Sequence, residues 1–104
     1  MLVTTTDLVP GRHVTETLGL VRGSAMRSRN LFQDLTEWLR NLVGAELTHY
    51  TKMMAETREQ ALDRMQDQAR ALGADAVIGV HIVATNITRG AAEFVAYGTA
   101  VRLG

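Results

Sequence analysis

The sequence contains no cysteine. This excludes a disulfide framework and a thiolate nucleophile, and it removes the soft ligand on which most sites for thiophilic metals depend. The 11 basic and 11 acidic residues balance, so no net charge favours non-specific binding to nucleic acid or anionic lipid. The sequence also lacks a signal-peptide pattern and any apolar run near the ~20 residues of a spanning helix. We therefore expect a cytoplasmic protein with no nucleic-acid or membrane partner.

Motifs for covalent catalysis and for phosphate binding are also missing. The sequence has no Gly-x-Ser-x-Gly elbow, and the segment from Gly19 to Gly23 lacks the Lys-Ser/Thr that ends a phosphate loop. We expect no enzymatic activity. The alternative is an enzyme that uses Glu46, His49 and Arg58 together, which would require these three side chains to converge in one pocket.

The 104 residues match the size of one ordinary domain, so residues 1–104 are expected to form a single unit. Strands are predicted over residues 2–6, 12–21, 76–84 and 93–103. Two amphipathic helices are predicted between them, one from Asn30 to a terminating Gly44 and one of about seven turns that ends at Gly73. Gly23 indicates a bulge or a close backbone approach. The fold class is α+β, with an antiparallel sheet and two helices in the order β-β-α-α-β-β.

Apolar side chains occupy both faces of the last two predicted strands. Alternation places Ile78, Val80 and Ile82 opposite Val77 and Val83, and the final strand sets Val95, Tyr97 and Val101 against Phe94, Ala96 and Ala100. Two helices are too few to cover both faces of the sheet. Apolar surface left exposed on a sheet face usually marks an interface. We therefore predict an obligate homo-oligomer in which the sheets of neighbouring subunits cover each other. The alternative is a monomer whose first helix covers the second face.

Several motifs together resemble the YbjQ-type family, a group of small bacterial proteins labelled as heavy-metal-binding. The resemblance spans about residues 19–101. It rests on Gly19 to Gly23, Asp34, Gly44-Ala45-Glu46-Leu47 with Tyr50, Arg58-x-x-Ala61 with Met65, and Leu72 to Val77. It implies a dodecin-like subunit in a cyclic homo-oligomer, commonly a pentamer. Ala45 replaces a glycine of the family pattern, and the lack of cysteine departs from the metal-binding label.

Arg58 is the first candidate site residue, because its position on the apolar stripe of the long helix requires that the guanidinium be paired or reach water. One interpretation is a buried or interfacial ion pair with Asp34 or Glu46. The other is a cleft in which Arg58 binds an anion. Together with Tyr50 from the family motif, these residues form a predicted group for a ligand or an interface ion pair.

Glu46 and His49 are the candidate metal ligands. They lie three residues apart on a predicted helix, the Glu-x-x-His spacing of carboxylate-bridged sites in helical bundles, but such sites use two copies of it. Oligomerisation could supply further copies, whereas a solvated helix face is the commoner explanation. His81 is interpreted as a hydrogen-bonded core or interface residue rather than as a ligand.

The leading hypothesis is a non-enzymatic, ring-forming protein that binds a heavy metal or small ligand where its subunits meet. A divalent metal ion is the only cofactor expected. The alternative is a structural or protein-interaction module with no bound ligand, whose ring displays the hairpin around Asn86 to partner proteins.

Overall fold

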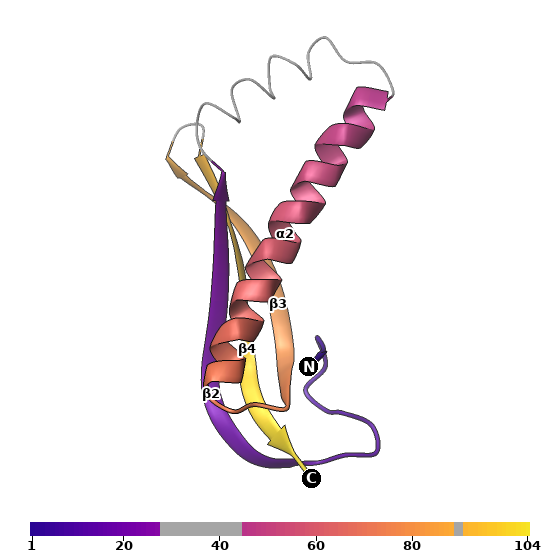
Figure 1. Cartoon of the computed structure of the whole chain (residues 1–104), viewed down its shortest axis with the longest axis vertical. Coiled ribbons are helices and arrows are strands. Elements are labelled where there is room, and N and C mark those ends of the chain that lie inside the picture. The colour runs from indigo at the N-terminus through magenta and orange to yellow at the C-terminus, as the bar shows by residue number, and fades with distance from the viewer. Residues whose placement is uncertain (28–44, 89–90) are drawn as a thin grey trace.

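In a computed structural model, residues 1–27, 45–88 and 91–104 are described. They form strand β1 (Leu2–Val3), strand β2 (Val14–Arg27), helix α2 (Ala45–Ala71), strand β3 (Ala76–Thr88) and strand β4 (Ala91–Leu103). The C-terminal half of α2 lies against one face of the sheet, and its N-terminal end lies farther from the strands (Figure 1). The predicted α+β class is confirmed in this mixed fold. The helix predicted over residues 30–43 lies outside the described residues.

The four strands are arranged in the order β1-β3-β4-β2. β4 pairs antiparallel with both β3 and β2, but β1 pairs parallel with β3, so the prediction of a wholly antiparallel sheet was wrong. The physical reason is that the first strand joins β3 instead of β2. Leu2 and Val3 pair with Ala76 and Val77. The segment after β1 stays beside β3 as far as Val80, which donates its N–H to the Thr4 carbonyl at 3.0 Å.

A β-bulge shifts the phase of β3 in the middle of its apolar run. Ile78 faces Thr99 and His81 faces Tyr97, so that Gly79 and Val80 together oppose one residue of β4. Gly79 has a φ of 60°, in the left-handed region that glycine adopts without a steric penalty. Val77 and Val80 consequently lie in the same core, and the predicted alternation, which placed them on opposite faces, was wrong.

The core lies between α2 and the sheet. It includes the fully buried side chains of Ala61, Met65 and Ala69 on α2, with Val21, Ala25, Phe94, Ala96 and Ala100 from β2 and β4. The predicted close approach at Gly23 is confirmed, because a Cβ there would overlap the backbone of Ala61 and Met65. Small side chains on both layers therefore allow the helix to pack directly on the strands.

Helix α2 ends where the sequence predicts. Gly73 has a φ of 79°, and it donates its N–H to the Arg70 carbonyl at 3.0 Å while Ala74 donates to the Ala69 carbonyl at 3.1 Å. This pair of bonds is the Schellman motif, which satisfies carbonyls that the last helical turn leaves unpaired. The motif turns the chain directly into β3. Among the described residues, no helix is long and apolar enough to cross a membrane.

Candidate functional site

The sheet face turned away from α2 carries a mixture of polar and apolar side chains, and we call it the open face. Strand register and alternation place on it, among others, Leu20, Arg22, Ser24 and Met26 of β2, Ile78, His81, Val83 and Thr85 of β3, and Glu93, Val95, Tyr97 and Thr99 of β4. Four large apolar side chains are exposed here, Leu20 by 73%, Met26 by 60%, Val83 by 42% and Tyr97 by 37%. Ala76 and Val101 continue this face at one end and are buried, so the described part of the chain covers that end and leaves much of the rest exposed.

One row of the open face joins three strands. Arg22 and His81 both pair with Tyr97, from β2 and β3 respectively. The rings of His81 and Tyr97 stack, with centroids 5.6 Å apart and planes inclined by 19°. The row thus brings a guanidinium, a phenol and an imidazole together on an accessible surface.

A backbone carbonyl fixes the orientation of the His81 ring. Nδ1 of His81 lies 2.9 Å from the Gly79 carbonyl oxygen. Because a carbonyl can only accept, Nδ1 carries the proton in this contact, and the Nε2 lone pair of the neutral ring is directed elsewhere. The bulge at Gly79 positions both partners of this bond, so the shape of the strand determines which nitrogen can bind a ligand.

The two outer edges of the sheet differ. On β2, side chains of α2 bind the outward backbone groups: Gln68 Oε1 accepts the Arg22 N–H at 2.7 Å, and Arg64 donates to the Ser24 carbonyl at 2.5 Å. On β3, the N-terminal segment pairs only as far as Val80, and residues 81–85 are all exposed. Side chains thus protect part of the β2 edge, which hinders strand pairing there.

The residues predicted to form a ligand or ion-pair group are only partly placed. Arg58 is exposed, because the neighbouring Thr57 takes the fully buried position on α2. Asp34 lies outside the described residues. Glu46, His49 and Tyr50 lie in the first two turns of α2, at the end farther from the strands, and their side chains lie outside the described part. Glu46 and His49 both lie within α2, the helix on which their spacing was interpreted.

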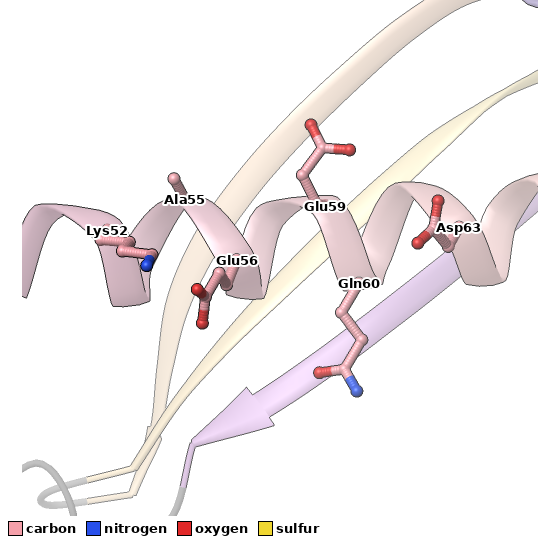
Figure 2. Close-up of a pocket in the computed structure, with 6 residues that line it drawn as sticks. All are labelled: Lys52, Ala55, Glu56, Glu59, Gln60 and Asp63. Atoms are coloured by element: carbon pink, nitrogen blue, oxygen red, sulfur yellow. The ribbon is translucent and has the colours of Figure 1, made fainter.

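A shallow hollow of about 470 Å³ lies along the outer side of α2, which the sequence reasoning did not predict. Six residues line it: Lys52, Ala55, Glu56, Glu59, Gln60 and Asp63. Figure 2 shows the Glu59 carboxylate directed away from Glu56 and Gln60. The acidic residues recur at helical spacing, which could have indicated a charged stripe. Within the described ranges, no three His, Asp or Glu side chains gather closely enough to hold a metal ion.

Comparison with known proteins identifies relatives over the full length. The family described as "Putative heavy-metal-binding" matches residues 1–104. A UPF0145 protein of Halorubrum lacusprofundi is 52% identical over 103 residues, covering 99% of both chains. A UPF0145 protein of Thermus thermophilus is also 52% identical, covering 99% of this chain and 90% of its own. Neither name describes a reaction.

A solved structure supports the fold. A Pediococcus pentosaceus protein of unknown function, from the DUF74 family, superimposes with a TM-score of 0.64 and covers 100% of this chain and 98% of its own. The two sequences are only 16% identical, so this likeness supports the architecture and nothing about activity.

Proposed function

The chain belongs to the family described as heavy-metal-binding, and on that premise we propose that it is a non-enzymatic, self-assembling cytoplasmic protein that binds a divalent metal ion or small ligand at subunit contacts. One observation carries the proposal. The open face exposes Leu20, Met26, Val83 and Tyr97, although α2 already covers the other face of the same sheet. Several large apolar side chains exposed on one face of a sheet favour an interface there.

The charges on the open face favour a second copy of the chain as the partner. Arg22 and Glu93 lie on the same face, on adjacent strands, with Glu93 four residues before the partner of Arg22 along β4. A surface that carries both signs can pair with itself, with the arginine of one subunit near the glutamate of the next. Such charge complementarity would support a contact between copies of the chain.

The energetics favour more than one contact per subunit. Fully burying a leucine- or methionine-sized side chain contributes roughly 1.5–3 kcal/mol, whereas association costs about 4 kcal/mol or more. The four exposed side chains are already partly buried, so a single contact made from them would be marginal. A ring gives every subunit two contacts through two different surfaces, and we propose a cyclic assembly in which the open face supplies one of them, with the pentamer that the family resemblance implies.

The alternative is a protein-interaction module that holds no ligand. It is favoured by the end of the β3–β4 hairpin, where the five consecutive residues 81–85 are exposed on both faces of the strand. The sheet edge beside them has no partner strand among the described residues, and a partner's strand could extend it. A metal-free assembly that recruits other proteins through this hairpin would favour the alternative.

Light scattering and metal analysis on untagged protein test the proposal. We expect a mass that is a multiple of 11.4 kDa, with a divalent metal at a fixed ratio to subunits. Leu20→Glu and Val83→Glu should each lower that mass, since each adds a carboxylate to the open face. Gln60→Glu adds the same charge to the outer side of α2 and should not change the mass. A wild-type mass of 11.4 kDa at micromolar concentration would refute the proposed assembly.

A further inference from the structure

The outer edge of β3 beyond Val80 carries backbone groups that are open to strand pairing. Val80 donates its N–H outward to the N-terminal segment at 3.0 Å, and the pairing of β3 with β4 is regular over residues 81–86. Because inward and outward groups alternate along a regular strand, the N–H and C=O groups of Ile82, Ala84 and Asn86 point away from β4. Among the described residues, no strand pairs with them.

The sequence of β3 does not protect this edge. Edge strands are usually shielded by charged side chains, by proline or by a covering element. β3 has no charged residue and no proline from Ala76 to Thr88, whereas β2 contains Glu16, Arg22 and Arg27 and has outward groups bound by side chains of α2. An uncharged edge that is rich in β-branched residues favours pairing with another strand.

A second copy of β3 is the strand that fits this edge. Two identical edges related by a two-fold axis pair antiparallel, and each supplies the donors and acceptors that the other lacks. No like charges meet across the axis, because β3 is uncharged. The β2 edge of a neighbour fits less well, since α2 side chains already bind its outward groups at Arg22 and Ser24. We infer that the outer edge of β3 pairs with the same edge of a partner subunit, so that two sheets become one.

The extent of the free edge sets the register of this pairing. The edge begins after Val80, whose N–H is already bonded, and it ends where the hairpin turns into β4. An axis at Ala84 places this residue opposite its own copy and Ile82 opposite Asn86 of the partner subunit. This register pairs every outward residue of the free edge, whereas an axis at Val83 leaves Asn86 without a partner.

The contact rests on the proposed self-assembly and extends it. A two-fold contact uses the same surface on both subunits, whereas the contacts within a ring of more than two subunits join different surfaces. Edge pairing therefore joins two rings instead of closing one, and the complete assembly contains an even number of subunits. Ala84 pairs with Phe94 of the core, so it lies on the side of the sheet that faces α2. A substitution at Ala84 can thus test the edge without changing the open face.

Engineered cysteines can report the pairing without background, because the chain has none of its own. In the proposed register, Val83 faces Thr85 of the partner subunit in a non-hydrogen-bonded pair, where Cα atoms lie about 4.5 Å apart, within the range for a disulfide. The double variant Val83→Cys/Thr85→Cys should form a disulfide-linked dimer on oxidation, seen in non-reducing gels. Neither single variant should do so. Gln60→Cys, on the outer side of α2, is the exposed control.

Light scattering on untagged protein provides the second measurement. We expect an even multiple of 11.4 kDa for the wild type. Ala84→Lys should halve that mass because it places like charges opposite each other at the axis, and Ala84→Ser should leave it unchanged. Ala84 is exposed, so neither change should impair folding, which circular dichroism checks.

Three results would overturn the inference and leave the proposed ring intact. They are a wild-type assembly with an odd number of subunits, a single-cysteine variant that cross-links as fully as the double variant, and a different protein retained at the β3 edge. A monomeric wild type would refute the proposed assembly as well.

Discussion

Replacing Gly23 by alanine tests how closely α2 packs on the sheet. A Cβ at this position would lie 2.7 Å from the carbonyl carbon of Arg64 and closer still to backbone atoms of Ala61 and Met65. Ordinary carbon contacts are about 3.5–4.0 Å, so the helix would have to move outward by about 1 Å. Backbone atoms cannot rotate away as the end of a flexible side chain can. The added methyl group therefore disturbs the whole helix–sheet contact.

The magnitude follows from the cost of overpacking. Extra methylene groups in a packed core usually cost about 1–3 kcal/mol, and a collision with helix backbone belongs at or above the upper end. We expect Gly23→Ala to lower the free energy of unfolding by about 3 kcal/mol or more in urea titrations followed by circular dichroism. Gly11→Ala is the control. Gly11 has a φ of 76°, and no atom lies within 4 Å of where its Cβ would be. Gly11→Ala should therefore lower the free energy of unfolding only by the cost of a left-handed alanine, about 1–2 kcal/mol. A Gly23→Ala protein as stable as Gly11→Ala would refute the proposed backbone collision.

Two further predictions concern stability. Met65 is fully buried between α2 and the sheet, so Met65→Ala should lower the free energy of unfolding by about 2–5 kcal/mol in the same titration, and a loss below about 1 kcal/mol would contradict its central place in the core. Arg102 and Glu16 form an ion pair at 3.3 Å with both side chains about half exposed. Glu16→Gln should therefore change the unfolding free energy by no more than about 1 kcal/mol, and a larger loss would show that the pair is less screened by solvent than its exposure indicates.

The sequence was sufficient to predict the elements whose signals are local. The end of α2 was predicted because a glycine after an amphipathic stripe ends a helix, and the hydrogen bonds of Gly73 and Ala74 confirm that rule. The close approach at Gly23 was also predicted, although its partners Ala61 and Met65 were not. The parallel pairing of β1 was missed, since no local pattern specifies which of several strands a short N-terminal segment joins.

The candidate site was less predictable from the sequence, because it depends on which of two neighbouring residues faces the core. On α2, the sequence pattern placed Arg58 on the apolar stripe, whereas the structure buries Thr57 and leaves Arg58 exposed. On β3, strict alternation from Val77 would have turned His81 toward α2 and Val80 toward the open face. The bulge reverses both, and it arises from the single glycine at position 79.

Gly79 thus links the stability of the fold to the chemistry of the open face. Its left-handed φ inserts the extra residue that turns Val80 into the core and His81 out beside Tyr97. The carbonyl of the same glycine accepts the Nδ1–H of His81 and leaves Nε2 free. A bulge costs a strand one regular pair of backbone hydrogen bonds, so it needs a compensating role. Here it supplies a buried valine to the core and an oriented imidazole to the surface that we propose joins the subunits.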